Sequence, residues 1–296
     1  MIVGMLEAGG TKMVCALGNE KGEIIEKISI PTTVPEETIP KIINYFKANE
    51  IKALGIGCFG PIDIDYTSET YGYITSTPKL AWRNFNIVGA FKEAFNIPIG
   101  FDTDVNASLL GEVTWGCAVG LTDALYLTVG TGIGAGVMTN GKLLHGMLHS
   151  EAGHILVRPE MNDTYTGACP YHKTCLEGMA SGTAIEKRWK EKAYNLESRS
   201  EVWELESSYL AQALTNYIMV LSPQKIILGG GIMHQKQLFP LIRKKVKALV
   251  NDYIQTRELE DLDQYIVPSS LNDNQGIMGC IKLAMNAINE SSIREV

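Results

Sequence analysis

The sequence lacks any apolar run close to the length of a membrane helix. A membrane-spanning helix needs about 20 consecutive apolar residues. The overall composition of the 296 residues, 45% hydrophobic and 20% charged, is ordinary for a globular protein. The first residues lead directly into an apolar segment, without the charged region and cleavage site of a signal peptide. We therefore expect a globular, cytoplasmic protein with no membrane partner.

An excess of basic charge is also missing. The 26 Lys and Arg residues are outnumbered by 33 Asp and Glu residues, which gives a formal net charge of −7. Nucleic-acid-binding proteins usually present a basic face, because contacts with phosphates supply much of their affinity. The densest basic group has the spacing of a solvent-exposed helix face and comprises Arg243, Lys244, Lys245 and Lys247. No nucleic-acid partner is expected.

Disulfides are not expected either, although the chain has six cysteines, because disulfides are rare in cytosolic proteins. Cys169 and Cys175 stand close together in an irregular segment and are treated below. The other four stand singly in apolar or helical surroundings and are best explained as small core residues: Cys15, Cys58, Cys117 and Cys280.

Glycine, by contrast, is abundant. It occupies 29 positions, about 10% of the chain against a typical ~7%. The glycines concentrate in turns between short apolar segments, a pattern typical of β-hairpins. Hydrophobic periodicity then predicts strands at 2–6, 13–17, 23–30, 52–58, 97–101, 125–129, 133–138, 225–228 and 265–267, and helices at 36–49, 87–95, 105–113, 175–192, 203–221, 238–249 and 276–289.

The chain contains an internal repeat. Gly-Thr dipeptides at 10–11 and 130–131 lie 120 residues apart, and each occupies the turn of the hairpin that opens its half of the sequence. This placement predicts two related α/β domains, at residues 1–115 and 116–296, with a cleft between their Gly-rich hairpins. A turn of Gly and Thr exposes backbone amides that suit phosphate oxygens, although a plain hairpin turn is the alternative.

Two familiar nucleotide motifs do not apply. The first turn has Gly-Thr where a P-loop requires Lys followed by Ser or Thr. The dinucleotide pattern G-x-G-x-x-G/A occurs at 55–60 and at 130–135, but neither copy has the required helix after it. We expect both copies to be strand ends and turns.

Two acids stand where a predicted strand ends and a helix begins, at Asp102 and Asp104. A carboxylate at such a point could accept a proton from a substrate hydroxyl. Capping of the helix by Asp104 or Thr103 is an equally good structural explanation.

A metal-ligand pattern follows in the irregular segment 140–175. Cys169, His172 and Cys175 form C-x-x-H-x-x-C, and His154 lies fifteen residues before Cys169. Structural zinc sites use four Cys and His ligands with short spacers. Unrelated loop residues are the alternative, and the rival ligands His145 and His149 have no neighbouring cysteine.

Three segments resemble motifs of the ROK sugar kinases, which have two actin-like (ribonuclease H-like) α/β domains with a nucleotide cleft between them. Residues 7–12 resemble the first phosphate motif, residues 128–136 the second, and residues 225–232 the strand and turn that hold adenosine. Glu7 stands where most members carry Asp. That residue and the metal loop look most like the bacterial fructokinases of this family.

The resemblance implies an enzyme that uses ATP and Mg²⁺ to convert D-fructose to fructose 6-phosphate, and it suggests a homodimer. A glucokinase, mannokinase or N-acylhexosamine kinase is the alternative. A non-catalytic sugar-sensing regulator is more remote, because the family's repressors carry an N-terminal helix-turn-helix and the first phosphate strand here starts at Ile2. The implied ATP and phosphate contacts are Gly9, Gly10, Thr11, Lys12, Gly130, Thr131, Gly132, Gly182, Gly229, Gly230, Gly231, Ile232 and Met233.

The sugar site follows from the same resemblance. Residues 102–107 are similar to the N-D-x-N-A motif, with Thr103 replacing Asn, which makes Asp104 the catalytic base. Residues 151–154 resemble the E-x-G-H motif and residues 175–177 the C-L-E motif. The implied sugar contacts are Thr103, Asp104, Glu151, His154 and Glu177, and the implied ligands of a closed, structural zinc are His154, Cys169, His172 and Cys175.

Overall fold

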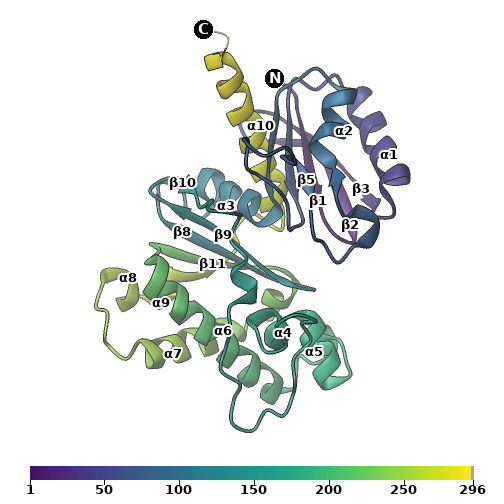
Figure 1. Cartoon of the computed structure of the whole chain (residues 1–296). Helices are drawn as coiled ribbons and strands as arrows, with labels where there is room; N and C mark the ends of the chain where they lie inside the picture. The colour runs from purple at the N-terminus through teal and green to yellow at the C-terminus, as the bar shows by residue number, and fades with distance from the viewer. Residues whose placement is uncertain (295–296) are drawn as a thin grey trace. The chain divides into compact units, whose positions relative to one another are not determined.

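The chain forms two α/β units, each built on a five-stranded mixed sheet, in a computed structural model that describes residues 1–294 (Figure 1). Unit 1 comprises Met1–Gly120, Leu144–Ser150 and the segment from Ser270 onward. Unit 2 comprises Leu121–Leu143 and Glu151–Ser269. The strand orders are β3-β2-β1-β4-β7 and β10-β9-β8-β11-β12, so the two sheets have the same plan. The internal repeat of the sequence is therefore a repeat of the fold.

In unit 1, an antiparallel hairpin leads into parallel strands. β1 pairs antiparallel with β2, and β1, β4 and β7 run parallel, so these three strands end at the same edge of the sheet. The strands are β1 (Val3–Ala8), β2 (Lys12–Gly18), β3 (Ile24–Pro31), β4 (Leu54–Cys58) and β7 (Ile99–Thr103), with a short ribbon of β5 (Tyr73–Ile74) and β6 (Phe85–Asn86). The helices are α1 (Pro35–Lys47), α2 (Ile87–Ala94), α3 (Asp104–Trp115) and α10 (Gln275–Arg294), and a 3₁₀ turn spans Leu80–Trp82.

The last helix, α10, packs on this sheet and on α3 (Figure 1). Glycines in the strands allow the approach, because a side chain on Gly55 would overlap the backbone carbonyl of Cys280 and one on Gly100 would overlap that of Leu283. The pattern at 55–60 is thus a packing surface, and no helix follows β4 directly. The expectation that this copy of the dinucleotide pattern is a strand end is confirmed.

Unit 2 repeats the arrangement. β8 pairs antiparallel with β9 and parallel with β11, which pairs parallel with β12. The strands are β8 (Ala124–Val129), β9 (Ile133–Thr139), β10 (Lys142–Leu143), β11 (Lys225–Gly229) and β12 (Ile266–Pro268). The helices are α4 (Leu176–Ala180), α5 (Gly182–Trp189), α6 (Ser200–Leu221), α7 (Leu238–Val250), α8 (Arg257–Glu260) and α9 (Leu262–Tyr265).

Two details differ from the sequence predictions. The segment from Ser270 onward belongs to unit 1 and not to a continuous C-terminal domain 116–296, because α10 buries its apolar face on the first sheet. The helix predicted at 175–192 is two helices, since Ser181 has an extended backbone and its hydroxyl caps α5 by accepting a hydrogen bond from the Ala184 amide at 3.1 Å.

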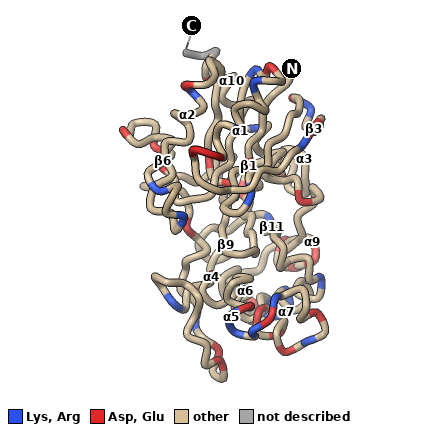
Figure 2. The backbone as a smooth tube through the Cα atoms, turned by 90° about the vertical axis from the view of Figure 1, so that its right-hand side faces the viewer, with Lys and Arg blue, Asp and Glu red and all other residues tan. Residues whose placement is uncertain are grey.

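Two members of the basic group on α7 form ion pairs with acids. Arg243 lies 2.6 Å from Asp263 and Lys245 lies 2.9 Å from Glu204, and Figure 2 shows acidic and basic residues interspersed around this helix. Among residues 1–294, no helix combines the length and the apolar character needed to cross a membrane.

Candidate active site

The first Gly-Thr turn joins β1 to β2 at the edge where the parallel strands of unit 1 end. The Gly9 amide donates to the Lys12 carbonyl oxygen at 3.1 Å, and the Thr32 hydroxyl donates to the Gly9 carbonyl oxygen at 2.7 Å. Within the described residues, the amides of Gly10 and Thr11 have no hydrogen-bond acceptor. A turn with available amides and little side-chain bulk can bind phosphate oxygens.

Asp104 is the first residue of α3 and lies at the same edge. Thr103 caps the helix, because its hydroxyl oxygen accepts a hydrogen bond from the Asn106 amide at 3.1 Å. The half-buried Asp104 carboxylate accepts from the Val105 amide at 2.9 Å. A carboxylate in the first turn of a helix is stabilised by the helix dipole. The structure therefore resolves the two capping alternatives in favour of Thr103.

Asp102 forms the centre of a network that the sequence did not reveal. Its Oδ1 accepts hydrogen bonds from the Thr103 amide and from Nδ2 of Asn106, both at 2.7 Å, and its Oδ2 lies 2.9 Å from Nε2 of His145. The hydrogen bond to the Asp102 carboxylate raises the pKa of His145 above its ordinary value. Nε2 of His149 accepts a hydrogen bond from the Ile62 amide at 3.1 Å. His145 and His149, the rival metal ligands, therefore anchor the segment Leu144–Ser150 within unit 1.

Glu7 lies on β1 close to the start of α10. A first side-chain carbon on Gly276 would lie only 2.8 Å from Cδ of Glu7, so the glycine makes room for the carboxyl group. Burial raises the pKa of Glu7, and the positive charges of Lys12 and Lys27 act in the opposite direction. The Glu7 carboxyl group thus belongs to a partly buried acidic side chain near the end of β1, shortly before the first Gly-Thr turn.

The second Gly-Thr turn, in unit 2, is held by the start of α5. The Gly182 amide donates to the Gly130 carbonyl oxygen at 2.7 Å, and the Thr183 hydroxyl donates to the Thr131 carbonyl oxygen at 2.8 Å. Position 182 requires a residue without a side chain, because a Cβ atom on Gly182 would lie 2.8 Å from the Gly130 carbonyl oxygen.

The turn expected to hold adenosine begins where β11 ends, beside this second phosphate turn. Gly229 pairs with Thr128 in the parallel register of β11 and β8, which places the two turns at one edge of the sheet. Gly230 has a positive φ of 88°, and its carbonyl accepts from the Met233 amide at 3.0 Å. The structure thus brings together the implied nucleotide residues of unit 2: Gly130, Thr131, Gly132, Gly182, Gly229, Gly230, Gly231, Ile232 and Met233.

Four potential metal ligands converge in unit 2. One ligand atom each from His154, Cys169, His172 and Cys175 lies within 4.8 Å of every other. Nδ1 of His154 is 3.9 Å from Sγ of Cys169 and 3.5 Å from Sγ of Cys175, and Nδ1 of His172 is 3.8 Å from Sγ of Cys169. Ligands about 2.2 Å from a tetrahedral zinc are about 3.6 Å apart. The donor set and its spacing therefore fit zinc, as predicted.

The second ring nitrogen of His154, Nε2, lies near two carboxyl groups. Nε2 of His154 lies 4.0 Å from Oε2 of Glu151 and 4.0 Å from Oε1 of Glu177. Burial and the neighbouring Glu177 charge raise the pKa of Glu151 to about 7. Oε2 of Glu177 also accepts a hydrogen bond from the Ile133 amide at 3.0 Å, directly after the second phosphate turn. This arrangement offers a ring nitrogen and two carboxyl groups to a polyhydroxylated ligand.

A buried arginine ties the metal loop to the helices of unit 2. Arg188 on α5 donates to the Met179 carbonyl oxygen at 2.9 Å and pairs with Asp163 at 3.1 Å. Its guanidinium lies 4.5 Å from the ring centroid of Tyr165. Asp163 also accepts a hydrogen bond from the Tyr209 hydroxyl at 2.6 Å. Only the folded structure reveals this tether, since its members are widely separated in the sequence.

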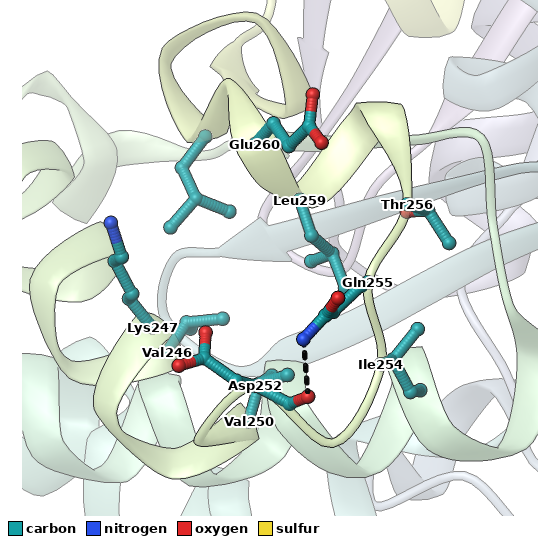
Figure 3. A pocket seen from close by; sticks show the side chains of 10 residues that line it. Val246, Lys247, Val250, Asp252, Ile254, Gln255, Thr256, Leu259 and Glu260 are labelled. Carbon is teal, nitrogen blue, oxygen red and sulfur yellow. Dashed lines mark hydrogen bonds between the residues drawn. The ribbon is translucent and has the colours of Figure 1, made fainter.

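A separate cavity of about 300 Å³ lies at the end of α7. Figure 3 shows it between α7 and α8, with a hydrogen bond from Gln255 to the Asp252 carbonyl oxygen. Its lining contains none of the residues implied for nucleotide, sugar or metal, so it is distinct from the sites described above.

The metal cluster makes a direct prediction. Protein purified without a metal-affinity tag should contain about one zinc per chain, and Cys175→Ser should lose it because one of four ligands is removed. Cys117→Ser, whose cysteine lies outside the cluster, is the matched control and should keep the metal. Elemental analysis measures both. Zinc retained by Cys175→Ser, or absent from the unaltered protein, would contradict the assignment.

The Asp102–His145 pair predicts a pH-dependent contribution to stability. Because the pair raises the folded-state pKa of His145, its ionic contribution is full below the unfolded pKa of about 6.5. That contribution is lost as pH rises through the folded-state pKa. Urea unfolding should therefore show that His145→Gln lowers the free energy of unfolding more at about pH 6 than at about pH 9.

The control for this prediction is the same substitution in an Asp102→Asn background. There the effect of His145→Gln should no longer depend on pH in this way, because the partner charge is absent. An equal pH dependence in both backgrounds would show that another group is responsible.

Comparisons with known proteins show the family and the fold of this chain. The family model described as the ROK family matches residues 3–287. A protein of Bacillus subtilis is 52% identical over 97% of this chain and 96% of its own length, and the fructokinase of Pediococcus pentosaceus is 44% identical over 97% of this chain and 99% of its own length. The crystal structure of a ROK hexokinase from Thermus thermophilus shares the fold, with a TM-score of 0.79, 23% identity and coverage of 98% of this chain and all of that one. The chain belongs to the ROK family.

Proposed function

We propose that this protein is an ATP-dependent fructokinase that transfers a phosphoryl group to the 6-hydroxyl of D-fructose. The observation that carries the proposal is the near-full-length identity of 44% to a fructokinase. The described residues supply the parts that such a reaction needs: Gly-Thr turns for phosphate oxygens, a carboxylate for the hydroxyl proton, and polar groups for the sugar.

Asp104 is proposed as the general base. Its position at the start of α3 is fixed by the Thr103 cap and by the hydrogen bond from the Val105 amide. The carboxylate would accept the proton of the sugar hydroxyl as the oxygen attacks the terminal phosphorus atom. The Asp102 network would hold the strand end, and Asn106 belongs to that network.

The sugar contacts are proposed to come from Thr103, Asp104, Glu151, His154 and Glu177. In this proposal the cluster of two cysteines and two histidines holds zinc as a closed structural site. With Nδ1 of His154 directed to the metal ligands, Nε2 of the same ring is directed toward Glu151 and Glu177. The metal would then orient the His154 ring for a sugar hydroxyl without taking part in bond breaking.

Magnesium is proposed to accompany ATP, with Glu7 as the acidic group of unit 1 closest to the first phosphate turn in sequence. When bound, Mg²⁺ neutralises charge on the phosphate oxygens. Glu7, Lys12 and the amides of the turn would orient the phosphates. Glu7 in place of the more common Asp keeps the charge on a longer side chain.

The substrate assignment is tested with a panel of hexoses and Mg·ATP, measured as kcat/KM. The kcat/KM for fructose should exceed the kcat/KM for glucose, mannose and N-acetylmannosamine by about tenfold or more, a ratio that single hydroxyl contacts can supply. A tenfold preference for glucose would overturn the named substrate and leave the kinase assignment standing. Failure to phosphorylate any hexose would overturn the proposed enzyme activity.

The base assignment predicts that Asp104→Asn lowers kcat by about 10²-fold or more, because general base catalysis is worth about 10²–10⁴-fold. The measurement is steady-state phosphorylation of fructose, with circular dichroism to verify folding. Asp65→Asn, an exposed aspartate of the same unit, is the control and should keep normal kcat. A well-folded Asp104→Asn with near-normal kcat would remove Asp104 from this role.

A further inference from the structure

Lys79 is an exposed lysine whose side chain lies against the first phosphate turn. It belongs to the connection between β5 and β6. A first side-chain carbon on Gly10 would lie 2.8 Å from Cε of Lys79, 3.7 Å from Cδ and 4.0 Å from Nζ. The lysine stem therefore occupies the space that a larger residue at position 10 would fill, and it brings the ammonium group to the turn.

Buried neighbours fix the backbone that carries Lys79. The Trp82 side chain is 1% exposed, and its indole N–H donates to the Thr33 carbonyl oxygen at 2.7 Å. Thr77 is fully buried, and its hydroxyl oxygen accepts a hydrogen bond from the Lys79 amide at 3.3 Å. The Trp82 amide in turn donates to the Lys79 carbonyl oxygen at 2.8 Å. The position of Lys79 over the turn is thus set by packing on both sides.

The charge of Lys79 is available to an anion. Among the residues that the structure describes, no carboxylate pairs with its ammonium group, in contrast to Lys245 on α7. The turn below it offers the amides of Gly10 and Thr11, and Lys12 follows directly in the chain. Two lysines and two amides without acceptors at one turn favour a multiply charged oxyanion such as a phosphate.

Lys79 also lies on the side of the sheet where the proposed base is located. The turn that it covers follows β1, and Asp104 follows β7, whose carboxyl end lies at the same edge as that of β1. A phosphoryl group on its way to a hydroxyl beside Asp104 would pass this edge, where a cation would lie close to it.

We propose that the Lys79 ammonium group binds the terminal phosphoryl group of ATP and stays with it during transfer. The inference rests on the proposed kinase function and adds a charged contact to it. The bond between the terminal phosphorus and the bridging oxygen breaks, ADP keeps the bonding electrons, and the sugar oxygen forms the new bond while its proton goes to Asp104. Lys79 contacts the oxygens of the group in transfer, where a fixed positive charge is most effective.

The test compares nucleotides that differ in the terminal phosphate. Calorimetry with the full chain should show that Lys79→Gln weakens binding of Mg·AMP-PNP by about tenfold, as expected for loss of one charged hydrogen bond. Binding of Mg·ADP should change by less than about twofold, because ADP lacks the phosphate in question. In fructose phosphorylation, kcat of Lys79→Gln should fall by about tenfold or more, and Lys79→Arg should recover part of that loss.

Lys52→Gln is the matched control, since Lys52 is an exposed lysine of the same unit two residues before β4, at the opposite end of that strand from the phosphate turn. Both nucleotides should bind it normally. Equal weakening of AMP-PNP and ADP by Lys79→Gln, or unchanged AMP-PNP affinity, would overturn the proposal. An unaltered protein that binds both nucleotides but phosphorylates no hexose would overturn the proposed function instead, and the AMP-PNP comparison would still decide the role of Lys79.

Discussion

Parallel pairing of the strands is the constraint on which the rest of the structure depends. Because β1, β4 and β7 run in one direction, the first phosphate turn and the start of α3 follow strand ends at one edge, and Lys79 lies against that turn. The pairing of β8 with β11 does the same for the second phosphate turn and for Gly229–Met233. The strand pairing brings these residues, which are far apart in the sequence, to common edges of the two sheets.

His154 connects two parts of unit 2 that have different chemistry. Its Nδ1 faces the sulfur atoms of Cys169 and Cys175, while its Nε2 faces the carboxyl groups of Glu151 and Glu177. A metal on one nitrogen fixes which nitrogen carries the proton, so the ring presents a defined donor to the other side. The ion pair of Arg188 with Asp163 holds the loop that carries Cys169, His172 and Cys175.

The sequence predicted those features that local patterns encode. The hairpins, the repeat and the metal ligands were visible because they depend on turns, alternation and short spacers, and the spacing of Cys169, His172 and Cys175 needs no long-range information. The Asp102–His145 pair and the position of Lys79 over Gly10 were not predictable, because each depends on contacts between distant segments. The same reason explains why the predicted domain boundary differs from the observed one. Hydrophobic periodicity shows that α10 is amphipathic, but it does not show which sheet the helix covers.

The placement of α10 affects the order in which the chain can fold during synthesis. The strands of unit 1 precede unit 2 in the chain, whereas α10, the helix that covers β1 and β4, follows unit 2. Unit 2 has all its strands and helices in Leu121–Leu143 and Glu151–Ser269, and can complete its core earlier. The nascent first sheet therefore keeps an apolar face uncovered until α10 has left the ribosome, a state in which exposed apolar surface favours aggregation or chaperone binding.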